Sequence, residues 1–189
     1  MAVFVGVYAA LVGQRLAELR VAARNAHWAR EQGAVEVGQS HYKWFVVLHV
    51  SWLTSGVIEA TASGPAVAAS GWLWLAAFGL AQPLRYVAIT TLGRRWNTRV
   101  FVFPDRPPVA SGIYRVLPHP NYLAVVIELL AVPLIFGAVW TATLATLANA
   151  LLLGAVRLPV ERRALQQMRH GVHPRSALPG DGDGTGAVG

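Results

Sequence analysis

Long apolar runs alternate with short polar segments along this chain of 189 residues. Five hydrophobic segments can be drawn, at roughly 2–22, 43–60, 70–92, 121–137 and 139–157. Each is near the length of about 20 residues with which a helix spans a bilayer, although the last two are at the short end of that range. The pattern predicts an all-α, polytopic membrane protein with about five transmembrane helices.

The last two segments are joined by almost no loop, which predicts a C-terminal helical hairpin that turns at Phe136, Gly137 and Ala138. Glu128 and Asn149 lie at nearly equal distances from that turn, about 15 Å along each helix at a rise of 1.5 Å per residue. We therefore expect that the two side chains can face one another. They would either lock the hairpin with a buried hydrogen bond or line a substrate cavity.

The composition agrees with a membrane protein and narrows the chemistry. Charged residues make up 13% of the chain, against about 25% in an average soluble domain, and hydrophobic residues make up 54%. The absence of cysteine excludes disulfides, thiolate metal sites and thiol nucleophiles. The N-terminal run lacks the charged start and cleavage site of a signal peptide, so it is predicted to remain as the first helix.

The positive charges predict an orientation in the membrane. Cytoplasmic loops hold an excess of Lys and Arg, and the connections at 61–69 and 137–139 contain neither. The N-terminus is therefore predicted outside, with the loops 23–42 and 93–120 and the C-terminus in the cytoplasm. The net charge of +7 describes an inner surface that faces anionic membrane lipids, and no nucleic-acid partner is needed to explain it.

The domain organisation is simple. Residues 1–173 are interpreted as a single integral membrane domain, and residues 174–189, rich in Gly and small polar residues, as a disordered tail. The only glycine-rich run lies in that tail, and neither a P-loop nor a dinucleotide-binding fingerprint occurs elsewhere. Paired histidines lack accompanying carboxylates, so no metal site is predicted.

Polar residues gather where the hairpin arms meet the inner membrane boundary. By counting residues from the turn, His119, Asn121 and Tyr122 on one arm lie level with Arg157 on the other. Glu161 follows Arg157 by one helical turn and can share its face. These five residues are either interfacial side chains that pair with one another or the rim of a binding site.

The local sequence LPHPNY favours a site. Pro120 suits the first turn of a helix, whereas the residues before a proline are driven into an extended conformation. His119 is therefore predicted beside a helix N-terminus, where free backbone N–H groups and the helix dipole attract an anion.

Further polar groups lie in the inner loop and the first helix. The loop offers Trp96, Asn97 and Arg99, and Trp96 can equally be an interfacial anchor. We add Asn97 and Arg99 to Glu128 and Asn149 as candidate substrate-cavity residues. In the first helix, a glutamate follows Arg15 by three residues, at position 18, and the two are predicted to pair.

The stretch GIYRVLPHPNY at 112–122, followed by a hairpin and by RLPVERRAL at 157–165, resembles the isoprenylcysteine carboxyl methyltransferase family of integral membrane methyltransferases. Segments at 14–44 and 84–100 are similar to small bacterial members found beside type III polyketide synthases, which methylate alkylpyrones or phenolic lipids. The resemblance implies S-adenosylmethionine as cofactor, bound in a cytosol-facing pocket, and a lipophilic acceptor that enters from the bilayer. It also implies a bacterial inner membrane and a polyketide synthase as a pathway neighbour.

The resemblance also implies roles for the boundary residues. His119, Asn121 and Tyr122 are expected to contact the cofactor, and Glu161 to help hold it. Arg157 is expected beside the methyl-transfer centre, with Glu161 as its catalytic companion.

Two positions depart from the family pattern: Pro118 stands where the family has Arg or Lys, and Arg162 replaces the second acid of a Glu-Glu pair. The nature of the acceptor decides the chemistry. Arg157 suits an acceptor that arrives as an enolate or carboxylate, because guanidinium binds planar oxyanions at two points. A phenol would need a base, for which Glu161 and His119 are the candidates.

If the chain is a methyltransferase, a polyketide-derived alkylpyrone or phenolic lipid is favoured as the methyl acceptor over a prenylcysteine-like carboxylate. Two other functions remain open from the sequence. One is an NADPH-dependent membrane lipid reductase similar to the steroid 5α-reductases, and the other is a non-enzymatic membrane scaffold or transporter. A transporter should place polar groups along a path to both faces.

Overall fold

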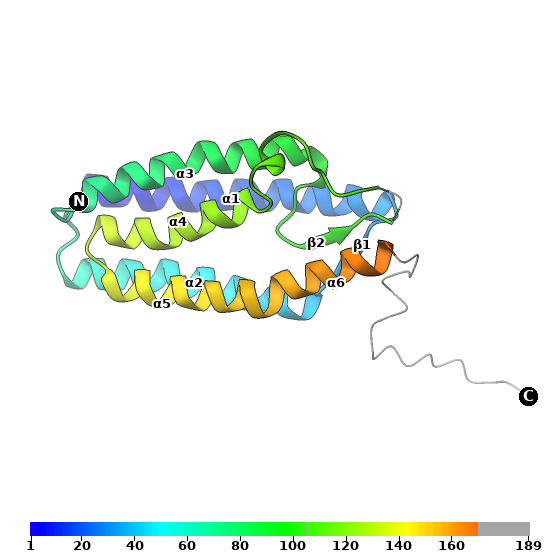
Figure 1. Ribbon diagram of the computed structural model, residues 1–189. Coiled ribbons are helices and arrows are strands. Elements are labelled where there is room, and N and C mark those ends of the chain that lie inside the picture. Colours follow the sequence, from blue (N-terminus) through cyan, green and yellow to red (C-terminus); the bar gives the residue numbers. More distant parts are fainter. Residues whose placement is uncertain (105, 170–189) are drawn as a thin grey trace, which may run out of the picture.

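The computed structural model describes residues 1–104 and 106–169, and its main body is a bundle of long helices (Figure 1). The predicted tail at 174–189 lies outside the described residues. The bundle helices are α1 (Ala2–Glu31), α2 (Gln39–Ala62), α3 (Gly71–Leu92), α4 (Pro120–Ile135) and α5 (Val139–Leu151). The chain then continues through a π-helical turn, η3 (Leu152–Arg157), into α6 (Leu158–Arg169).

Several helices have the length and composition of membrane spans. Within the described part of the chain, three stretches are long and apolar enough to cross a membrane: Ala2–Glu31, Gln39–Ala62 and Val139–Gln167. Pro120–Ile135 is a shorter apolar helix. The chain is thus an integral membrane protein, and the count of five spans stays a prediction because α3 and α4 fall outside this group.

Helix boundaries differ from the predicted ones mainly at the polar ends. α1 does not end near residue 22 but continues to Glu31, and α6 continues the last apolar segment to Arg169. Alanine, arginine and glutamate are strong helix formers, so a helix can extend beyond the hydrophobic segment from which it is predicted.

The chain is mostly helical, as predicted, and a small sheet that was not predicted adds to the helices. β1 (Val35–Val37) pairs antiparallel with β2 (Val100–Val102), and both strands come from segments predicted as loops. The valines alternate with other residues, so all four point to one buried face, where Ala164 of α6 joins them in a hydrophobic cluster. The sheet therefore ties the two polar loops to the C-terminal helix.

The predicted hairpin turn is confirmed. α4 ends at Ile135 and α5 begins at Val139, and Gly137 adopts a φ of 74° that a side chain would disfavour. Glu59 of α2 fixes the start of α5, because its carboxylate accepts hydrogen bonds from the backbone N–H groups of Trp140 at 3.0 Å and Thr141 at 2.8 Å. This contact satisfies free amides of the first helical turn.

A cluster of six polar side chains joins α1, α3 and α4 inside the bundle. Its members are Gln14, Arg15, Glu18, Gln82, Arg85 and Glu128. The predicted pair of Arg15 and Glu18 is present at 2.7 Å. Arg85 also donates to Glu18 at 3.1 Å, and two positive charges meet two negative ones. The cluster is neutral overall, and charged side chains are tolerated inside an apolar helix bundle when opposite charges pair in this way.

Glu128 corrects another prediction. It does not pair with Asn149; instead Arg85 donates to it from Nε at 2.9 Å, and both Arg15 and Arg85 form ion pairs with its second oxygen. Both Arg85 and Glu128 are only 1% exposed, so Arg85 is not one of the surface charges that set topology. In an apolar interior a carboxylate is stabilised far more by a guanidinium than by an amide.

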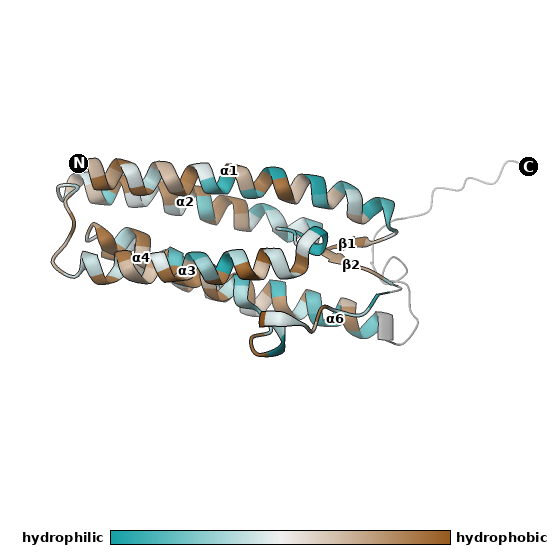
Figure 2. Cartoon of the chain, turned by 90° about the horizontal axis from the view of Figure 1, so that it is seen from above, coloured by the Kyte–Doolittle hydropathy of each residue, from teal (hydrophilic) through white to brown (hydrophobic). Residues whose placement is uncertain are grey.

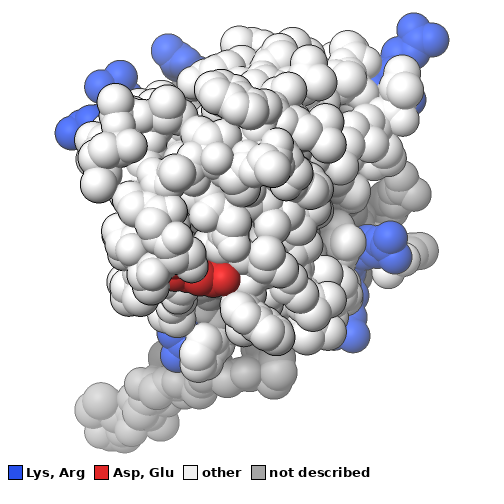
Figure 3. Space-filling model, turned by 90° about the vertical axis from the view of Figure 1, so that its left-hand side faces the viewer, with Lys and Arg blue, Asp and Glu red and all other residues white. Residues whose placement is uncertain are grey.

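The two ends of the bundle differ in polarity. The sheet, α6 and the hydrophilic half of α1 lie at one end (Figure 2). The opposite end presents a mainly uncharged surface with one acidic spot, and blue Lys and Arg atoms are visible only around its margin (Figure 3). This asymmetry agrees with the uneven distribution of charge along the sequence.

Candidate active site

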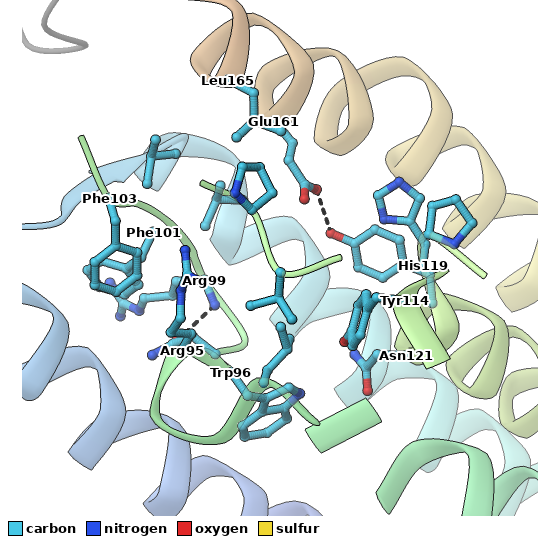
Figure 4. Close-up of a pocket in the computed structure, with 18 of the residues that line it drawn as sticks. Arg95, Trp96, Arg99, Phe101, Phe103, Tyr114, His119, Asn121, Glu161 and Leu165 are labelled. Carbon is cyan, nitrogen blue, oxygen red and sulfur yellow. Dashed lines mark hydrogen bonds between the residues drawn. The ribbon is translucent and has the colours of Figure 1, made fainter. Parts of the chain in front are cut away.

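A pocket of 430 Å³ lies at the polar end of the bundle. Its walls come from the loop after α3, β2, the start of α4, the end of η3 and one face of α6 (Figure 4). Seven of the predicted site residues line it: Asn97, Arg99, His119, Asn121, Tyr122, Arg157 and Glu161. Glu128 and Asn149, predicted as substrate-cavity residues, do not line this pocket.

Tyr122 is the centre of the polar wall. Its hydroxyl donates to Glu161 Oε2 at 3.0 Å and accepts from Arg157 Nε at 3.2 Å. The ring of His119 stacks on the ring of Tyr122, with centroids 5.1 Å apart and planes 11° from parallel. Counting residues along the hairpin had placed these groups at one depth, and the structure brings them into contact.

Arg157 is held firmly at the base of this wall. It is 7% exposed, its Nη2 donates to the backbone oxygen of Thr98 at 3.0 Å, and its guanidinium lies 5.9 Å from the ring of Phe45. Arg157 is the last residue of the π-helical turn η3, and such turns change the direction in which later side chains point. A guanidinium has five N–H groups, so donors remain for a ligand.

The start of α4 has the predicted form. Pro120 is the first helical residue, and His119 precedes it with φ −131° and ψ 60°, outside the helical region. The His119 side chain makes no capping hydrogen bond, because its ring stacks on Tyr122 instead. Pro120 has no N–H, and the Leu123 amide donates to the His119 backbone oxygen at 3.2 Å, so the amides of Asn121 and Tyr122 are the first-turn donors left for an acceptor group.

Asn97 and Arg99 line the pocket, and their polar atoms also fix the loop. Asn97 Nδ2 donates to the backbone oxygen of Ala22 at 2.9 Å, and Asn97 Oδ1 accepts from the backbone N–H of Arg99 at 3.0 Å. Arg99 Nη1 donates to Glu36 Oε1 at 2.7 Å, and the guanidinium lies 4.6 Å from the ring centroid of Tyr42. These contacts attach the pocket loop to α1, β1 and α2.

Glu36 anchors this side of the site. Burial alone would raise the pKa of its carboxyl, but hydrogen bonds from Arg99 and Arg30 outweigh burial and lower the pKa below its ordinary value. Glu36 therefore stays ionised and holds both arginines. On the opposite wall, burial and then the neighbouring Tyr122 and Glu161 raise the pKa of Tyr114 to about 12, so its hydroxyl stays protonated.

Trp96 was the least expected member of the pocket. It is only 2% exposed, which rules out an interfacial anchor, and Asn25 of α1 holds its backbone oxygen at 2.7 Å. The indole Nε1 is buried without a hydrogen-bond partner, and so is Oδ1 of Asn121. The burial of Trp96 is not predictable from the sequence, since a tryptophan after a membrane helix has the same pattern whether it faces lipid or a pocket.

The positions that depart from the family pattern lie at different places. Pro118 lines the pocket, so the missing Arg or Lys removes a cation from its wall. Arg162 is exposed on α6, one residue after Glu161. The single acid that remains is the one that faces the pocket.

Comparisons with known proteins identify the family of this chain. Residues 74–167 match the model of the isoprenylcysteine carboxyl methyltransferase (ICMT) family, a range that includes every residue that lines the pocket. The chain is 39% identical over 160 residues to the uncharacterized protein YpbQ of Bacillus subtilis strain 168, covering 84% of this chain and 94% of that protein. It is 25% identical over 162 residues to an uncharacterized protein of Haemophilus influenzae strain Rd, covering 85% and 94%.

No solved structure matches the chain significantly. The family match and the extensive similarity to YpbQ nevertheless suffice for an assignment. This chain belongs to the isoprenylcysteine carboxyl methyltransferase family of membrane methyltransferases.

Proposed function

We propose that this protein transfers a methyl group from S-adenosylmethionine to an oxygen of a lipophilic acceptor at the membrane. The observation that carries the proposal is the set of contacts around Tyr122, which places a carboxylate, a guanidinium and an imidazole on one wall of a pocket. Family membership favours methyl transfer over the lipid reductase and over a scaffold or transporter.

The residues present fit the cofactor. A volume of 430 Å³ lies within the range of about 300–1,000 Å³ for small-molecule sites. Glu161 offers a carboxylate to hydroxyl or ammonium groups, and the aromatic ring of Tyr114 offers a flat surface for a base. Two buried polar atoms without partners, Trp96 Nε1 and Asn121 Oδ1, leave hydrogen bonds to be made by a ligand.

When bound, S-adenosylmethionine supplies an electrophilic methyl group on a positively charged sulfur. The acceptor oxygen has to be held near 3 Å from that methyl, in line with the bond to sulfur, and such positioning contributes up to about 7–11 kcal/mol in favourable cases. The transfer would replace the C–S bond by a C–O bond and would leave the electron pair of the broken bond on sulfur. Arg157 orients the acceptor oxygen, because Thr98 and Tyr122 hold its guanidinium in one place.

The protonation of the acceptor sets the remaining task. An acidic enol or a carboxylate arrives as an anion, and Arg157 then needs only to orient it. A phenol has to lose a proton, and the carboxylate of Glu161 or the imidazole of His119 accepts it. Both groups lie next to Tyr122 on the same wall, so either acceptor class fits the proposal.

We further propose that the protein lies in the inner membrane of a bacterium. The polar end of the helix bundle then faces the cytoplasm. The loops that carry most Lys and Arg residues meet at that end, as the positive-inside rule requires. The acceptor would enter from the bilayer between the apolar helices. A polyketide-derived alkylpyrone or phenolic lipid is the acceptor that we favour, with a polyketide synthase as its source, and a prenylcysteine-like carboxylate is the second choice.

Isothermal titration of the purified protein in detergent tests the cofactor. S-adenosylmethionine should bind with a measurable Kd, and NADPH should not. Glu161→Gln should weaken binding by about tenfold or more, because it removes a charge that faces the pocket. Glu31→Gln, at an exposed position paired with His27, is the matched control and should bind as the unaltered protein does. Binding of NADPH alone would overturn the proposal.

A further inference from the structure

Two unsatisfied polar atoms belong to residues that line the pocket. Trp96 Nε1 is a hydrogen-bond donor and Asn121 Oδ1 is an acceptor, both are closed to solvent, and among the described residues neither has a partner. Figure 4 shows both side chains in the lower part of the view, across from Glu161. They come from separate elements, since Trp96 follows η1 (Gly93–Arg95) and Asn121 lies in the first turn of α4.

Such a pair is costly unless something binds it. A buried polar group without a partner costs about 1–3 kcal/mol, and here a donor and an acceptor in the lining of one pocket both carry that cost. A single ligand satisfies both atoms if it presents a hydrogen-bond acceptor to Trp96 Nε1 and a hydrogen-bond donor to Asn121 Oδ1. A planar heterocycle does this, and the aromatic ring of Tyr114, which also lines the pocket, suits its flat face.

We propose that Trp96 and Asn121 recognise the adenine base of the cofactor by the edge farthest from its sugar. In this arrangement Trp96 Nε1 donates to ring nitrogen N1, and Asn121 Oδ1 accepts from the 6-amino group. Glu161 lies across the pocket, where it can reach the sugar or the amino acid part, so the far edge of the base points toward Trp96 and Asn121. The inference rests on the proposed function and adds the residues that select the base.

Binding of S-adenosylhomocysteine to variants tests the assignment without measuring activity. Trp96→Phe keeps the ring and removes the donor, and Asn121→Ala removes the acceptor. Each should raise the Kd by about tenfold, the effect of one lost hydrogen bond that leaves its partner group unpaired. Trp72→Phe is the matched control, because Trp72 is exposed at the start of α3, and its Kd should stay within twofold.

Analogues of the ligand test the same edge in the unaltered protein. S-inosylhomocysteine carries an oxygen in place of the 6-amino group and a hydrogen on N1, which would face the indole N–H. It should bind at least tenfold more weakly than S-adenosylhomocysteine, and Trp96→Phe should reduce this discrimination severalfold because it removes one of the two opposed donors. The 7-deaza analogue keeps the proposed edge and should bind as S-adenosylhomocysteine does.

The outcomes separate the inference from the proposed function. If the unaltered protein binds neither S-adenosylmethionine nor S-adenosylhomocysteine, both fall. If it binds them but tolerates S-inosylhomocysteine equally well, or if both variants bind within twofold of the unaltered protein, only the assignment of Trp96 and Asn121 falls. The analogue comparison needs no substitution, so it decides the question even where Trp96→Phe fails to fold.

Discussion

Neutralising Glu128 should destabilise the helix bundle strongly. In Glu128→Gln the two arginines of the buried cluster, Arg15 and Arg85, face a single carboxylate, that of Glu18. Removing one partner of a buried ion pair costs about 3–5 kcal/mol, because the remaining charge is left uncompensated. In a chain of this length each kcal/mol lowers Tm by about 2–4 °C, so we expect a loss of about 10 °C.

Thermal unfolding in detergent, followed by circular dichroism, measures this loss. The double variant Glu128→Gln with Arg85→Gln restores the balance of charge and should recover roughly half of the lost stability. Glu31→Gln, whose side chain is 58% exposed, is the control and should change Tm by no more than about 2 °C. A Tm for Glu128→Gln within 2 °C of that of the unaltered protein would refute the reasoning that the ion pairs, rather than the packing of the side chains, hold these helices together.

Because Glu128 lies outside the pocket, the Kd for S-adenosylhomocysteine should stay unchanged in the folded variant.

Other outcomes follow from the site and its supports. Arg157→Ala should lower methyl transfer by about 10²–10³-fold while the protein remains in the membrane, and normal turnover in that variant would remove Arg157 from the mechanism. Glu59→Gln should lower Tm by about 2–4 °C without altering transfer, because it weakens the hydrogen bonds to the first amides of α5. The lowered pKa of Glu36 means that its contribution to stability is complete above its ordinary pKa of about 4.3 and is lost as the pH falls through the folded-state pKa. Glu36→Gln should therefore flatten the acid side of the curve of Tm against pH, and an unchanged acid side would count against this.

The hairpin shows what residue counting can and cannot predict. The number of residues from the turn fixes the height of a side chain along a helix, which is why Tyr122 and Arg157 were correctly placed at one level. It says nothing of the direction in which the side chain points around the helix axis. Glu128 and Asn149 share a height, yet Glu128 points toward α1 and α3, where two arginines bind it.

The remaining surprises have a common physical origin. The sheet strands are only three residues long, so a periodicity of two is hard to recognise in them even though their valines alternate. The burial of Trp96 depends on a loop that folds back over the end of the bundle and is tied to α1 by Asn25. Contacts between segments far apart in the sequence determine both the pairing of the strands and the burial of Trp96. Such contacts cannot be predicted from the local pattern of hydrophobic and polar residues.

Methyl transfer itself is the most direct test of the central claim. Membranes that contain the protein are incubated with methyl-labelled S-adenosylmethionine and a bacterial lipid extract, and the products are separated and weighed by mass spectrometry. The account predicts a labelled lipid heavier by one methyl group with the unaltered protein, and about 10²–10³-fold less of that label with Arg157→Ala. Equal label in lipids from both preparations, or no label beyond that of membranes without the protein, would contradict it.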